Sequence, residues 1–139
     1  MTAIRKLFSS QSWNTDLAAL LLRVVFGGLM LWLHGHGKLM KWDEYSVKFA
    51  EPFGMPSYLS AALTIFAEFF CCILIVLGLF TRLSAVPIII CMAVAAFNIH
   101  WADSMHDKEA SLTYMGAFIA IFILGGGKYS VDYLLSKKA

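Results

Sequence analysis

Four apolar stretches, each about as long as a bilayer is thick, constrain this chain more than any other feature. They cover residues 17–34, 58–80, 83–100 and 111–127. The hydrocarbon core of a membrane needs roughly 20 apolar residues in an α-helix. A helix satisfies its own backbone hydrogen bonds in lipid, whereas the strict two-residue alternation of a membrane β-barrel is missing from this sequence. We therefore predict an all-α protein, a four-helix transmembrane bundle formed by one domain over residues 1–139.

The composition excludes the main alternatives. Hydrophobic residues make up 60% of the chain and charged residues only 14%, whereas a soluble domain carries about 25% charged residues. Such a chain cannot cover a water-facing surface, and its apolar content is too high for a disordered protein. A net charge of +2 without a long basic run excludes a nucleic-acid partner. The lipid bilayer is the predicted partner.

The N-terminus resembles a secretory signal peptide, because Arg5 and Lys6 precede the first apolar run. However, Arg23 interrupts that run and no small-x-small cleavage site follows it, so we expect a retained first helix. Four spans place both termini on one side of the membrane. That side carries six Lys and Arg residues against four on the other, which predicts cytoplasmic termini by the positive-inside rule.

Two charged residues stand inside the predicted spans, Arg23 in the first and Glu68 in the second. A charge at the bilayer centre costs at least about 2.5–3.5 kcal/mol, so each requires a partner. Counted from the outer ends of their spans at about 1.5 Å per residue, both lie roughly 15 Å deep. The equal depths predict an Arg23–Glu68 ion pair. Either this pair only fixes the register of two helices, or it forms the floor of a polar cavity, which intramembrane charges favour.

One face of the first helix leads from this charge to the outer surface. At about 100° per residue, five of its side chains fall within about 80° of each other. They are Arg23, Gly27, Met30, His34 and Lys38. The adjacent Gly27 and Gly28 allow a neighbouring helix or a ligand to approach the backbone closely.

All four histidines are predicted to lie on the outer side of the membrane. They are His34, His36, His100 and His106. Such a group suits a metal, a haem or proton exchange, whereas the alternative is a set of histidines solvated at helix ends. The pattern alone does not assign a metal site, so these four histidines are only candidates for metal ligands.

The cysteines Cys71, Cys72 and Cys91 all lie in predicted spans. Their odd number gives no disulfide framework, and we favour small buried hydrophobes over a Cys72–Cys91 redox pair. No motif for a catalytic nucleophile, a zinc protease or a phosphate loop is present, so the chain is not assigned as an enzyme. Any catalysis would be redox or proton chemistry supplied by a cofactor.

Several motifs occur in a fixed order over residues 17–132. They are Arg23 with His34-Gly-His-Gly-Lys-Leu39, Glu68 with Leu77-Gly-Leu-Phe-Thr-Arg82, and Gly125-Gly-Gly-Lys-Tyr-Ser-Val-Asp132. In this order they resemble the motifs of the DoxX family. The resemblance implies a four-helix, multi-pass protein of the bacterial cytoplasmic (inner) membrane.

The resemblance also implies a redox association. Relatives are linked to quinone-coupled thiosulfate oxidation, to quinol oxidase complexes and to a membrane complex that handles oxidative thiol stress. A quinone-linked redox subunit or accessory protein is therefore expected, with quinone favoured over haem and with other redox subunits as partners. Its ligand or proton-relay pocket would comprise Arg23, His34, Lys38, Glu68 and His100. A non-enzymatic scaffold or chaperone, a small-molecule or metal carrier, and a homo-oligomer remain open.

Overall fold

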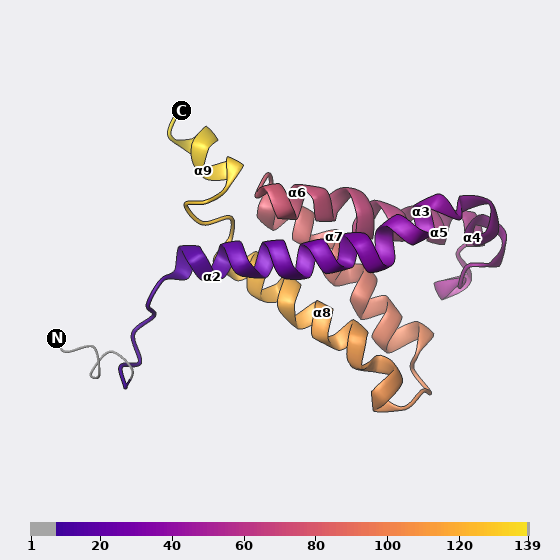
Figure 1. The fold of residues 1–139 in the computed structure, drawn as a ribbon. Helices are drawn as coiled ribbons and strands as arrows, with labels where there is room; N and C mark the ends of the chain where they lie inside the picture. The colour runs from indigo at the N-terminus through magenta and orange to yellow at the C-terminus, as the bar shows by residue number, and fades with distance from the viewer. Residues whose placement is uncertain (1–7, 139) are drawn as a thin grey trace.

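The computed structural model describes residues 8–138, which are helical or irregular and contain no strand (Figure 1). The all-α prediction is therefore confirmed for this part of the chain. Arg5 and Lys6, which entered the predicted orientation, lie outside the described residues. The side of the membrane that each end faces remains a prediction.

The first long helix runs without interruption from Thr15 to Met40, well beyond the predicted end at residue 34. The side chain of Asn14 caps its start by accepting a hydrogen bond from the Leu17 amide at 2.9 Å. The helix consists of α2 (Thr15–Leu22), the π-helical segments η1 (Arg23–Gly27) and η2 (Met30–Gly35), and α3 (His36–Met40). Because π-helical turns contain an extra residue, they rotate the following side chains relative to an ideal α-helix.

A short connection joins the first long helix to the second. It contains α4 (Trp42–Lys48) and the 3-10 turn η3 (Pro52–Gly54). The amide of Phe49 donates to the Ser57 hydroxyl at 2.7 Å, which ties this connection to the start of the second helix. That helix consists of α5 (Ser57–Ile65), the π-helical η4 (Phe66–Cys71) and α6 (Cys72–Leu77).

A tight turn, residues 78–80, links the second long helix to the third. Gly78 adopts φ 71°, and the amide of Leu79 donates to the Leu74 carbonyl at 2.9 Å. This is the usual glycine-terminated end of a helix. The third helix, α7 (Thr81–Val94) followed by the π-helical η5 (Ala95–Ile99), begins at Thr81. The predicted spans 58–80 and 83–100 leave residues 81 and 82 as the link between them, whereas in the structure both residues belong to the third helix.

A fourth long helix, α8 (Met105–Leu124), packs against α7, and a short α9 (Val131–Ser136) follows. Among the described residues, three helices are long and apolar enough to span a membrane: Thr15–Met40, Ser57–Leu77 and Thr81–Ile99. The charged residues 107–109 at the start of α8 make this helix less apolar than the other three. A fourth membrane span therefore remains a prediction.

The long helices form two pairs that meet at one end of the bundle and diverge at the other. In Figure 1, the pair of the first and second helices and the α7–α8 pair converge near α9 and spread apart toward α5. A core that includes Cys72, Ile75, Ile88 and Phe118 packs between the helices, together with Met30, which also lines the cavity described below. The diverging part holds the candidate site.

Candidate functional site

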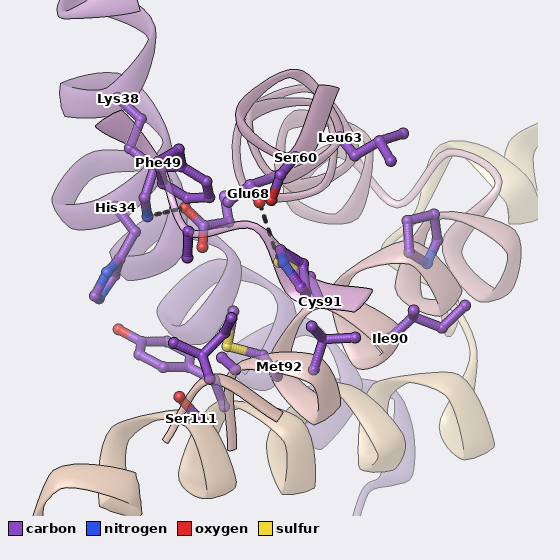
Figure 2. A pocket seen from close by; sticks show the side chains of 18 of the residues that line it. His34, Lys38, Phe49, Ser60, Leu63, Glu68, Ile90, Cys91, Met92 and Ser111 are labelled. Atoms are coloured by element: carbon purple, nitrogen blue, oxygen red, sulfur yellow. Dashed lines mark hydrogen bonds and ion pairs between the residues drawn. The ribbon is translucent and has the colours of Figure 1, made fainter. Parts of the chain in front are cut away.

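A cavity of about 680 Å³ lies between the two diverging helix pairs (Figure 2). Its walls come from the first three long helices, from α8 and from the connection around residues 49–55. Ligand sites in proteins typically enclose about 300–1,000 Å³. Most of the wall is apolar, whereas the polar groups gather toward its first-helix side (Figure 2). The cavity therefore has the size and the chemistry of a site for an amphipathic small molecule.

The polar part is built on an ion pair between Lys38 and Glu68. The Lys38 ammonium donates a hydrogen bond to the Glu68 carboxylate, and the side chains are 18% and 4% exposed. Two such charges in an apolar environment stabilise one another, and removing either leaves the other buried and uncompensated. The pair thus places one cation and one anion at the cavity wall.

Gly35 explains how the two helices come close enough for this pair. Gly35 ends η2 and packs directly against the backbone of η4, where an added Cβ would lie 2.4 Å from the Glu68 carbonyl oxygen. Small residues allow such close helix packing in membranes. Gly28, one of the two glycines expected to serve this purpose, has nothing within 4 Å of an added Cβ. Gly27 does lie close to α6, where an added Cβ would lie 3.1 Å from side-chain atoms of Ile75 and Val76.

Further polar groups line the same cavity. The His34 ring meets the Tyr114 ring edge-on, with 5.4 Å between their centroids. His100 also lines the cavity, and its Nδ1 lies 2.6 Å from the Asp103 carboxylate. His34, Lys38, Glu68 and His100 thus all line one cavity.

Arg23 is not part of this site, and the predicted Arg23–Glu68 ion pair is wrong. Arg23 is completely buried at the other end of the bundle, where its guanidinium donates to the carbonyls of Ile75, Val76 and Tyr129 at 3.3, 3.2 and 2.8 Å. The first two carbonyls belong to the last turn of the second helix, where few backbone N–H groups follow to bind them. The Ile75 carbonyl also accepts a hydrogen bond from the Gly78 amide at 3.1 Å. Arg23 therefore holds a helix end and the C-terminal segment together.

The error in the predicted pairing has a physical cause. The depth of Arg23 was counted from His34 as the helix end, but the helix continues to Met40. Arg23 therefore lies deeper from the outer end than Glu68 does, and Lys38 reaches the depth of that carboxylate. The Nε atom of Arg23 has no hydrogen-bond partner among the described residues.

Asp132 completes the structure at the Arg23 end. Its carboxylate accepts hydrogen bonds from the amides of Phe80 and Thr81 at 2.7 and 2.9 Å and from the Thr81 hydroxyl at 2.7 Å. Burial raises the pKa of the Asp132 carboxyl, but these hydrogen bonds and the charge of Arg23 outweigh burial and hold its pKa below the ordinary value. The motifs around Leu77–Arg82 and Gly125–Asp132 are therefore joined to each other here and not to the cavity.

The metal candidates do not converge. His36 stacks on Trp32 with 5.2 Å between ring centroids, and His106 lies on the surface beside Glu109 at 3.7 Å. Within residues 8–138, no group of three or more His, Cys, Asp or Glu side chains is arranged to hold a metal ion.

The cysteines are free thiols. Cys91 lines the cavity and lies 3.9 Å from the Thr64 hydroxyl, whereas Cys71 and Cys72 are buried in the core.

Tyr114 is a polar cavity residue that the sequence does not single out among the predicted site residues. It lies on α8 within the predicted fourth span and contacts His34. A phenolic hydroxyl in the interior of an apolar helix usually finds a hydrogen-bond partner when buried, which is the signal that could have identified it. The other tyrosines and the tryptophans lie near or beyond the ends of the predicted spans, where an aromatic belt explains them.

A sequence model of the DoxX family matches residues 18–101, more than half of the 139 residues. The chain belongs to the DoxX family. No curated protein and no solved structure matches it. The matched range of this DoxX-family protein contains His34, Lys38, Glu68 and His100, whereas the segment Gly125–Asp132 lies beyond it.

Proposed function

We propose that this DoxX-family protein is a quinone-linked subunit or accessory protein of a membrane redox system, and that its cavity binds the quinone. The observation that carries the proposal is the cavity of about 680 Å³ with the buried Lys38–Glu68 pair in an otherwise mainly apolar wall. A quinone has carbonyl oxygens on a flat ring and an apolar tail, so both parts of this wall suit it. The family membership supports the same class of ligand.

The residues of the cavity have distinct roles in this proposal. The Lys38 ammonium donates a charge-assisted hydrogen bond to a ring oxygen, which is stronger than a neutral one. The Glu68 carboxylate beside it accepts or returns a proton, and His34 lines the same wall. His100, held by Asp103, exchanges protons with the same cavity. A bound quinone supplies two-electron, two-proton chemistry, and the electrons are exchanged with a partner redox subunit.

A direct binding experiment tests the proposal. Decylubiquinone is titrated into the protein in lipid nanodiscs, and the dissociation constant is measured for wild type, Lys38→Met and Glu68→Gln. Loss of a hydrogen bond to a charged group costs about 1.5–3 kcal/mol, so each variant is expected to bind about 10- to 150-fold more weakly. Lys48→Met is the matched control, because Lys48 is exposed on α4 and does not line the cavity.

Two results would contradict the proposal. One is the absence of quinone binding by the wild-type protein. The other is unchanged binding and unchanged quinone-dependent electron transfer in Glu68→Gln once the redox complex is reconstituted. A complementary measurement is the ultraviolet spectrum of an organic extract before and after borohydride reduction, with the protein purified in its native lipids. A quinone that copurifies gives a reduction-dependent change in that spectrum.

A non-enzymatic scaffold is the second candidate, and the contacts of Arg23 favour it. These contacts join the first helix, the second helix and residue 129 through backbone carbonyls alone, which is an assembly role. A scaffold has no use for the Lys38–Glu68 pair beyond folding. Variants of that pair whose folded fraction loses quinone binding and activity would therefore exclude the scaffold as the whole function.

A further inference from the structure

The wall of the cavity opposite Lys38 faces the outside of the protein. Leu63 on α5 and Ile90 on α7 both line the cavity, yet they are 50% and 58% exposed. Figure 2 shows these two side chains at the edge of the cavity farthest from His34 and Lys38. The cavity is therefore bounded on this side by residues that also contact the surroundings of the helices.

The helices separate at this position. The second and third long helices are joined tightly at residues 78–80, and α7 packs against η4 and α6, before α5 and α7 diverge (Figure 1). A contact between α5 and α7 beside the cavity joins two small side chains, Cys91 and Thr64, at 3.9 Å. In a bilayer the exposed apolar residues on either side of this gap face lipid.

A second approach to the cavity, from the end of the bundle, is covered by a segment of the chain. The connection between the first two long helices contributes Phe49, Pro52, Phe53 and Met55 to the wall at the end of the bundle. The hydrogen bond from the Phe49 amide to Ser57 holds this connection in place. A molecule with a long hydrocarbon tail would have to pass through water and beneath this segment to enter from that end.

We infer that the gap between α5 and α7 is a lateral portal, and that the ligand is a membrane-dissolved amphiphile whose tail leaves through it. The polar ring or head lies beside Lys38 and Glu68, while the hydrocarbon tail lies between Leu63 and Ile90 in contact with lipid. This inference rests on the proposed quinone site and adds where the tail runs and how the molecule enters. A polar portion inside and an apolar exit into lipid are complementary to such a molecule and not to a freely water-soluble one.

The test compares two quinones that differ in their tails. Decylubiquinone and the tail-less ubiquinone ring are titrated into nanodiscs that contain wild type, Leu63→Trp or Ile90→Trp. The tryptophans fill the portal, so decylubiquinone is expected to bind about tenfold more weakly, equivalent to losing the burial of about two methylene groups. The affinity for the tail-less ring is expected to stay unchanged. Leu83→Trp is the control, because Leu83 is a 71% exposed residue of α7 that does not line the cavity.

A second variant protects the test against misfolding. Ile90→Ala removes contact with the tail without adding bulk, so it too is expected to weaken decylubiquinone binding several-fold and to leave the ring unaffected. Equal binding of decylubiquinone by wild type, Ile90→Trp and Ile90→Ala would overturn the portal while leaving the quinone site intact. Failure of both quinones to bind the wild-type protein would overturn the quinone site and the portal together.

Discussion

Gly35→Ala is expected to destabilise the protein strongly, although it adds a single methyl group. The new Cβ would lie 2.4 Å from the Glu68 carbonyl oxygen, and ordinary contact begins at 3.4 Å, so the two helices must move apart by about 1 Å. Overpacking a close contact costs about 1–3 kcal/mol, and the displacement also weakens the charge-assisted hydrogen bond between Lys38 and Glu68, which contributes about 1.5–3 kcal/mol. Alanine recovers about 0.5–1 kcal/mol of helix preference. The net loss is about 2–5 kcal/mol.

Gly28→Ala provides the matched control. Gly28 lies on the same helix with helical dihedrals, and nothing lies within 4 Å of an added Cβ. This variant is expected to gain about 0.5–1 kcal/mol. Both free energies of unfolding are measured by titration with sodium dodecyl sulfate in mixed micelles, followed by far-ultraviolet circular dichroism. If Gly35→Ala were as stable as Gly28→Ala, the close contact between the first and second helices would be refuted.

Three further predictions concern the charged groups. Arg23→Lys is expected to lower the free energy of unfolding by about 3 kcal/mol or more, because a lysine cannot bind three separated carbonyls. The folded fraction should bind decylubiquinone as wild type does. Loss of that binding would show that Arg23 belongs to the site. The low pKa of Asp132 stabilises the fold above the unfolded pKa of about 3.9, and this stability is lost as the pH falls through the lower native pKa. Unfolding measured between about pH 5 and 2 should show that loss in wild type and a smaller one in Asp132→Asn. In a double-mutant cycle, Lys38→Met and Glu68→Gln should each destabilise the protein by about 3–5 kcal/mol. The double variant should lose less stability than the sum of the two single losses, because they share one ion pair. Additive losses would argue against the ion pair.

The helices themselves were predictable, since their positions follow from apolar runs of about the right length. Their ends were less predictable. The sequence His34-Gly-His-Gly-Lys38 contains two glycines and two histidines, which would end a helix in water. In this protein Gly35 instead lies against the backbone of the neighbouring helix, and the first helix continues to Met40. The close packing of Gly35 against the second helix outweighs the low helix propensity of these residues.

The candidate site was predictable in its residue types but not in its pairing. His34, Lys38, Glu68 and His100 were selected as polar residues near or within apolar helices, and the structure places all four at one cavity. The pairing depended on relative depth, so a change of six residues in one helix end exchanged Arg23 for Lys38 as the partner of Glu68. The relative depth of two residues on different helices depends on tertiary packing, which counting residues along one helix cannot give.

The lining of the cavity by the portal residues Leu63 and Ile90 was beyond prediction from the sequence for a different reason. Each of them is a common residue on an apolar helix, and its neighbours there are equally apolar. What distinguishes them is the divergence of α5 from α7 and the position of α8, which are properties of the assembled bundle. Single-helix patterns contain no information about where two helices separate.

The hydrogen bond between Arg23 and the carbonyl of Tyr129 also has a consequence for biosynthesis, because the two residues are 106 positions apart. At roughly 5–20 residues per second, a ribosome needs about 5–20 seconds to extend the chain from one to the other. If the first helix inserts into a membrane before then, its guanidinium lacks one of its three carbonyl acceptors, and a long basic side chain can extend to the aqueous interface. Tyr129 is the last of these three acceptors to be synthesised. Completion of the bundle is thereby coupled to the arrival of the Gly125–Asp132 segment, so a stalled chain that lacks this segment would present an incompletely bound arginine at the membrane surface.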